Sequence, residues 1–171
     1  MMFQFLNKII CIISIRMVLK NAVKRSYFLN LFTNDSNICQ KTTNSGGTKI
    51  TTFRWNIRDL QLGSEAEIGL VQLVHTGASN NTGYAIRCLE TYADGFDCYN
   101  FTSAILYLGM GLNTPSIATY HKLLSQNLNT ITLVITDDLT SSTGISSGIG
   151  TSITLGMVLE IIDYIDDNQT Y

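Results

Sequence analysis

The side chains most able to do chemistry are two histidines and one pair of carboxylates. His75 and His121 are the only histidines, and neither has a histidine, cysteine or carboxylate at a spacing typical of metal ligands. A catalytic histidine also needs a partnered nucleophile, and no G-x-S-x-G motif is present. Glu65 and Glu67 are two residues apart and would share one strand face, as an acid/base pair could. Burying two like charges is costly, so we expect both carboxylates to face solvent and both histidines to be surface or strand-end residues.

Three further segments resemble ligand sites only in composition. Residues 144–150 (GISSGIG) are as rich in glycine as a phosphate-binding loop, but no Lys-Ser/Thr pair follows and the next element is a predicted strand. Asp94 with Asp97, or Asp137 with Asp138, would supply far fewer oxygen atoms than Ca²⁺ requires. We therefore predict no catalytic, cofactor-binding or metal site, no small-molecule substrate and a protein that is not an enzyme.

Four cysteines, Cys11, Cys39, Cys88 and Cys98, are scattered without a CxxC motif. We expect reduced thiols, two of them in the core. Cys88 and Cys98 could be bridged if their strands lay side by side, although a cytosolic site of assembly would keep them free.

The composition favours strands over helices. The 171 residues suffice for one domain with an extension, charged residues make up only 14%, and there is a single proline. Strong helix formers are scarce, whereas β-branched residues abound. Such a weakly charged surface is easier to understand if much of it contacts other subunits.

The N-terminal segment differs from the rest in charge. Residues 1–25 carry a net charge of +5 and residues 26–171 a net charge of −7, which together give −2. Residues 9–15 form an apolar run too short to span a bilayer. Three interpretations remain: a membrane-interacting arm, an uncleaved signal, or translation that begins at Met17. A basic arm could contact the phosphates of lipid or nucleic acid, or it could simply keep the terminus soluble.

Period-two alternation of apolar residues predicts strands along most of the chain. The stretch from Lys49 to His75 predicts two strands separated by Gly63 and Ser64, which we expect to be antiparallel neighbours. The clearest strand runs from Ile153 to Ile161, where five alternate positions are apolar. Other predicted strands are 84–89, 103–109, 130–136, an edge strand at 26–32, and 117–124, where a helical turn fits nearly as well; 33–48 and 137–150 are predicted loops.

Eight strands without a long amphipathic helix predict an all-β fold, a sandwich or barrel. Eight is the number of strands in a single jelly-roll β-sandwich. The predicted organisation is a basic, partly apolar arm at 1–47 that includes the edge strand, a jelly-roll domain at 48–165 and a polar tail at 166–171.

The order of these strands is similar to that of the single jelly-roll penton and minor capsid proteins of large double-stranded DNA viruses and virophages. The resemblance covers residues 26–163 and rests on the segments 53–57, 60–62, 67–73, 84–89, 105–109, 133–137 and 153–160. The first sixteen residues have no counterpart in that family.

The resemblance implies a structural capsid subunit in the virion, assembled in the cytoplasm or nucleus of the host. Five copies would form a homopentamer that closes an icosahedral vertex and contacts neighbouring major and minor capsid proteins. The basic arm would then face an internal membrane or nucleic acid. The alternative is a jelly-roll binding module, lectin-like or receptor-binding, that uses loops 77–83 and 109–116; a glycosidase on a sandwich ranks third.

Overall fold

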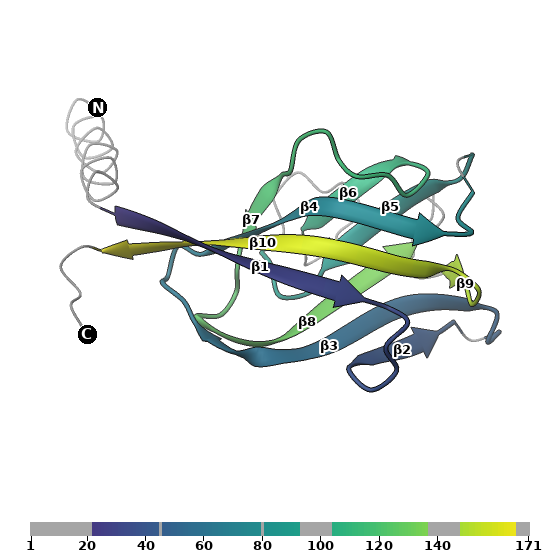
Figure 1. Cartoon of the computed structure of the whole chain (residues 1–171), viewed down its shortest axis with the longest axis horizontal. Helices are drawn as coiled ribbons and strands as arrows, with labels where there is room; N and C mark the ends of the chain where they lie inside the picture. Colours follow the sequence, from purple (N-terminus) through teal and green to yellow (C-terminus); the bar gives the residue numbers. More distant parts are fainter. Residues whose placement is uncertain (1–21, 45, 80, 93–103, 137–147, 167–171) are drawn as a thin grey trace, which may run out of the picture.

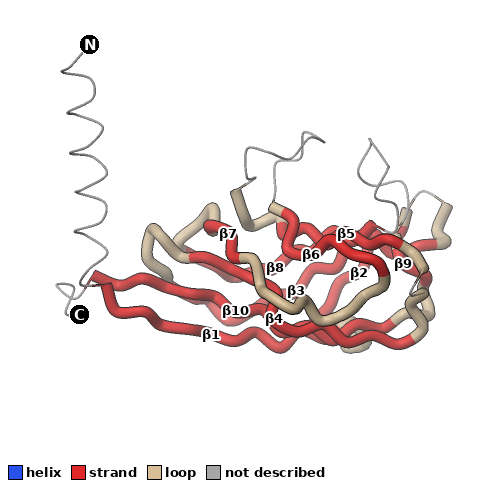
Figure 2. The backbone as a smooth tube through the Cα atoms, turned by 90° about the horizontal axis from the view of Figure 1, so that it is seen from above, coloured by secondary structure: helices blue, strands red, loops and turns tan. Residues whose placement is uncertain are grey.

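The protein is an all-β sandwich. The computed structural model of the chain describes residues 22–44, 46–79, 81–92, 104–136 and 148–166. These residues form ten strands and no helix, arranged in two antiparallel sheets that face each other (Figures 1 and 2). The predicted all-β class and the two-sheet arrangement are therefore confirmed.

Each sheet is built from strands that are far apart in the sequence. Sheet A has the order β1 (Ala22–Phe32), β10 (Thr154–Asp166), β4 (Glu67–Thr76), β7 (Tyr120–Lys122). Sheet B has the order β2 (Cys39–Thr43), β3 (Lys49–Gln61), β8 (Asn127–Thr136), β5 (Gly83–Cys88), β6 (Ile105–Met110), and β9 (Ile149–Gly150) pairs with the start of β3.

The main strands pair from the two ends of the chain inward. The outermost, β1 and β10, pair with each other, and so do β3 with β8, β4 with β7, and β5 with β6. Consecutive strands therefore often lie in different sheets: β3 is in sheet B, β4 in sheet A and β5 in sheet B.

The expectation that the two strands between Lys49 and His75 are antiparallel neighbours is wrong, because β3 and β4 lie in opposite sheets. The connection between them is anchored to both layers. The Leu62 amide donates to the Gln126 carbonyl at 2.7 Å, beside sheet B, and the Gly63 amide donates to Asp163 Oδ1 of β10 at 2.7 Å. The five residues between β3 and β4 are enough to cross the spacing of about 10 Å between packed sheets.

Other predicted boundaries need smaller corrections. The edge strand expected at 26–32 lies within β1, which is the edge of sheet A. The predicted loop 33–48 contains β2, and the last residues of the predicted loop 137–150 form β9. Of the two options for 117–124, a short strand, β7, is correct.

The core lies between the sheets. On β10, Leu155, Met157, Leu159 and Ile161 are each at most 2% exposed, as their alternation predicts. From sheet B, the rings of Phe53 and Trp55 stack with centroids 5.9 Å apart. Trp55 also donates from Nε1 to the carbonyl of Phe32 at 3.1 Å, which links the two sheets.

Two β-bulges explain where the alternation changes phase. Thr51 of β3 has no partner on β2, so both Ile50 and Phe53 face the core although they are three residues apart. Val71 of β4 likewise has no partner on β10, and buried Leu70 and Leu73 flank it.

Candidate interaction surface

The structure does not bring the two histidines together. His75 is half-buried near the end of β4, and its Nδ1 accepts a hydrogen bond from the Ala78 amide at 3.3 Å. His121 lies opposite Ile68, seven residues or about 23 Å from His75 along β4. The prediction of a surface or strand-end position is confirmed for His75 and wrong for His121, which is only 7% exposed.

The two glutamates do not share a strand face. Glu65 lies in the connection before β4, is exposed, and forms an ion pair with Lys122 Nζ at 2.9 Å. Glu67 begins β4, is half-buried and accepts a hydrogen bond from the Tyr164 hydroxyl at 3.5 Å. The expected solvent exposure is therefore confirmed only for Glu65, and the expected shared face is wrong because β4 begins after Glu65.

The other segments considered for metal or phosphate give no site within the described residues. No group of three or more metal-binding side chains occurs in the described part of the chain. Asp94, Asp97, Asp137, Asp138 and residues 144–147 lie outside it. Gly148 serves packing, because a Cβ there would lie 1.9 Å from the carbonyl oxygen of Ile50.

The two described cysteines are buried free thiols, Cys39 and Cys88. Burial raises the pKa of Cys39 to about 11. Burial, followed by the nearby Glu90 carboxylate, raises the pKa of Cys88 well above its ordinary value. Both groups thus remain protonated near neutral pH and are poor nucleophiles. Cys11 and Cys98 lie outside the described residues.

The outer face of sheet A carries a more distinctive arrangement, in which two rows of side chains run across the strands. Phe28, Glu160, Gly69 and Tyr120 form the first row, from β1 to β7. The ring of Tyr120 covers Gly69, where a Cβ would be 2.9 Å from Cδ1 of the ring. The Tyr120 hydroxyl thereby reaches past β4 and donates to Glu160 Oε2 on β10.

This hydrogen bond perturbs both partners. It is the main reason that the pKa of Tyr120 is raised to about 12 and that the pKa of Glu160 is lowered, and a hydrogen bond from Ser26 further lowers the latter. The contact ties the three-residue edge strand β7 to the long strand β10. The sequence signal for it is a glycine inside a strand pattern, which often marks a close approach by another group.

Replacing Tyr120 with phenylalanine is expected to weaken the dependence of stability on pH. The pKa of Glu160 is depressed in the folded state, so its contribution is present above the ordinary value of 4.5 and is lost as the pH falls through the folded value. The pKa of Tyr120 is raised, so its contribution is present below 10.0 and is lost as the pH rises toward about 12. Urea unfolding across this range measures both effects.

Tyr164→Phe is the matched control, because Tyr164 lies on the same sheet and its hydroxyl donates a longer bond, 3.5 Å, to Glu67. Equal pH profiles for Tyr120→Phe and the wild-type chain would contradict the assignment.

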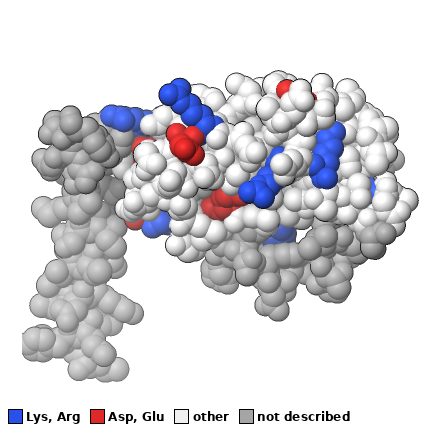
Figure 3. Space-filling model, turned by 90° about the horizontal axis from the view of Figure 1, so that it is seen from below, with Lys and Arg blue, Asp and Glu red and all other residues white. Residues whose placement is uncertain are grey.

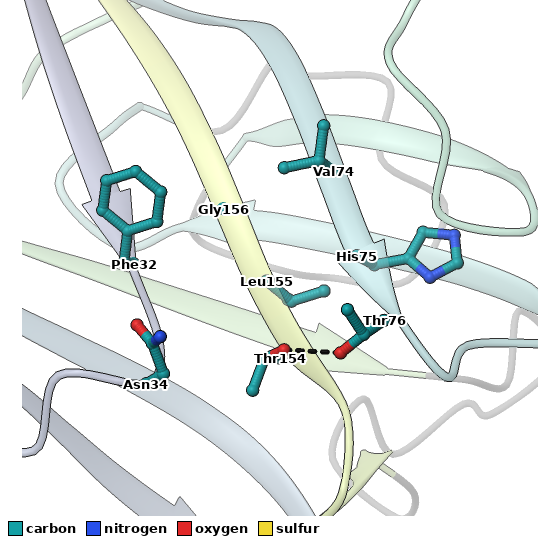
Figure 4. A pocket seen from close by; sticks show the side chains of 8 residues that line it. All are labelled: Phe32, Asn34, Val74, His75, Thr76, Thr154, Leu155 and Gly156. Atoms are coloured by element: carbon teal, nitrogen blue, oxygen red, sulfur yellow. Dashed lines mark hydrogen bonds between the residues drawn. The ribbon is translucent and has the colours of Figure 1, made fainter.

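The second row, Phe32, Gly156 and Val74, surrounds a hollow. A Cβ on Gly156 would lie 2.9 Å from Val74 Cγ2 and 3.1 Å from Phe32 Cε1, so these two apolar side chains approach each other over the glycine. Phe32 and Val74 are each 52% exposed. The hollow, which we name the sheet A groove, has a volume of about 250 Å³ and is also lined by Asn34, His75, Thr76, Thr154 and Leu155 (Figure 4). The Thr76 and Thr154 hydroxyls are hydrogen-bonded at its rim, 2.5 Å apart.

Exposed apolar side chains also occur on the edge strand β6 of sheet B. Leu108 is 61% and Met110 60% exposed, and they lie opposite Ala85 and Gly83 on β5. Tyr107, which lies opposite Ile86 on β5, faces the core instead. We name Leu108 and Met110 the β6 ridge.

Charge is sparse on the part of the surface that Figure 3 shows, where most of the described side chains are neither acidic nor basic. Within the described residues, no helix is long and apolar enough to cross a membrane. Comparison with protein families and with curated proteins finds no match to this chain.

Proposed function

We propose that the sandwich is a single jelly roll and that the chain is a structural capsid subunit, the penton protein whose five copies close an icosahedral vertex. The observation that carries the proposal is the strand order. The sheets β1-β10-β4-β7 and β3-β8-β5-β6 have the nested pairing of one long hairpin wrapped into two layers, which supports a jelly-roll winding. Jelly rolls occur in viral capsids, lectins and cupins, so the winding alone leaves a choice among them.

The surface favours assembly over the other uses of this winding. The described residues contain no cluster of metal ligands such as a cupin-type enzyme would need. Exposed apolar side chains occur on both sheets, at the sheet A groove and the β6 ridge. Apolar patches of this kind are typical of surfaces that contact other proteins. Neighbouring major and minor capsid proteins are the proposed further partners, and the basic residues 1–25 are proposed to contact an internal membrane or nucleic acid in the virion.

The oligomeric state of the full-length chain tests the proposal. Native mass spectrometry and negative-stain microscopy are expected to show closed rings of five copies. A chain that stays monomeric at high concentration would contradict the proposal. If that monomer also bound immobilised glycans, the binding-module alternative would replace it.

A further inference from the structure

We propose that the β6 ridge of one copy inserts into the sheet A groove of the next copy, and that this head-to-tail contact closes the ring. The inference rests on the proposed function and specifies which surfaces of the subunit carry it.

The groove has the chemistry of a socket for aliphatic side chains. Its walls include the half-exposed side chains of Phe32 and Val74, which approach each other over Gly156. Its volume of about 250 Å³ leaves room for several water molecules. Releasing such water from an apolar surface favours binding of an apolar group.

The ridge has matching chemistry. Leu108 and Met110 are both more than half exposed and belong to β6, the outermost strand on its side of sheet B. Methionine is unbranched and flexible, so it adapts to an irregular hollow. None of the eight residues that line the groove is Asp, Glu, Lys or Arg, and β6 (ILYLGM) contains none either. The contact therefore buries no unpaired carboxylate, ammonium or guanidinium group.

The positions of the two patches determine what assembly they can build. The groove is on the outer face of sheet A and the ridge is on the outer face of sheet B, so they lie on opposite sides of the sandwich (Figure 2). A contact between two different patches leaves one groove and one ridge unused after each addition. Such a heterologous contact adds subunits one after another and gives a ring if the rotation between neighbours closes, or an open filament if it does not, whereas a patch that pairs with itself stops at a dimer.

The experiment uses the full-length chain with one patch blocked at a time. Val74→Asp places a charge in the groove, and Met110→Asp places one on the ridge. Each variant alone is expected to be a monomer at concentrations where the wild-type chain forms rings. Mixed together, they retain one intact groove and one intact ridge between them, so native mass spectrometry is expected to show a dimer with one copy of each, and no ring.

Leu124→Asp is the matched control. Leu124 is 48% exposed, similar to Val74. It lies far from the groove, because it comes two residues after Lys122, which pairs with Glu67. Glu67 is about 23 Å from Val74 along β4. This variant is expected to form rings like the wild-type chain. Circular dichroism establishes that each variant is folded, and Phe32→Ser and Leu108→Ser replace any aspartate variant that is not.

The outcomes separate the two proposals. Rings that persist in Val74→Asp or Met110→Asp, or a mixture that stays monomeric, would overturn this interface and leave the pentameric subunit standing. A wild-type chain that forms no rings would overturn both.

Discussion

The variant Trp55→Ala is expected to lose about 3 to 5 kcal/mol of stability, the usual cost of truncating a large buried aromatic side chain to alanine. Trp55 is 1% exposed, and its ring stacks on Phe53 within the core. Its removal would leave a cavity between the sheets and would also delete the hydrogen bond to the Phe32 carbonyl. Urea unfolding at a fixed protein concentration measures the loss, since assembly makes apparent stability depend on concentration.

Two further variants separate the causes of this loss. Trp55→Phe keeps most of the packing but removes the indole donor, and its cost is expected to be about 1 kcal/mol for the hydrogen bond plus a smaller cavity. Tyr92→Ala removes an aromatic side chain that is 50% exposed and is expected to change stability by about 0.5 kcal/mol or less. If Trp55→Ala cost no more than Tyr92→Ala, Trp55 could not occupy the core position described here.

A second large effect is expected from Gly63→Ala, which should cost about 3 kcal/mol, at the upper end for overpacking a tight site. An alanine Cβ would lie 2.7 Å from the carbonyl oxygen of Tyr164 and 3.0 Å from Asp163 Oδ1. The β10 backbone cannot withdraw easily, because Tyr164 is paired with Lys24 on β1. If the connection between β3 and β4 moved instead, it would break the hydrogen bond from the Gly63 amide to the Asp163 carboxylate. That carboxylate belongs to a residue that is only 1% exposed. Leaving a buried carboxylate with one partner fewer is costly.

Gly46→Ala provides the control for the general effect of adding a methyl group to a glycine. The nearest atom to a Cβ at that position is Asn44 Oδ1 at 3.7 Å, an ordinary contact in an exposed turn. Its stability is expected to be unchanged or slightly raised, because alanine restricts the unfolded chain. Equal urea midpoints for the two variants would mean that residue 63 is not wedged against β10.

The sequence alone determined most of the strands and which of their faces are buried, because both depend on local alternation, although β2 and β9 lie in segments predicted as loops. The five alternate apolar residues from Ile153 to Ile161 predict β10, and all five are buried in the structure. The same reasoning places Trp55 in the core. The alternation changes phase near Ile50 and Leu73 because of the bulges at Thr51 and Val71. A bulge arises from pairing with a neighbouring strand, so the local sequence does not reveal it.

Only the tertiary structure decided which strands are neighbours. The short break at Gly63 is compatible with a hairpin and with a crossing between layers, and the contact with Asp163, one hundred residues away, selects the crossing. The same holds for the outer face of sheet A, where Gly69 and Gly156 look alike in the sequence. Gly69 is covered by the ring of Tyr120, whereas Gly156 lies under the side chains of Phe32 and Val74, because different residues from distant strands lie beside them. Alternation is a property of adjacent residues, whereas strand order and surface hollows arise from pairs that meet only when the chain folds.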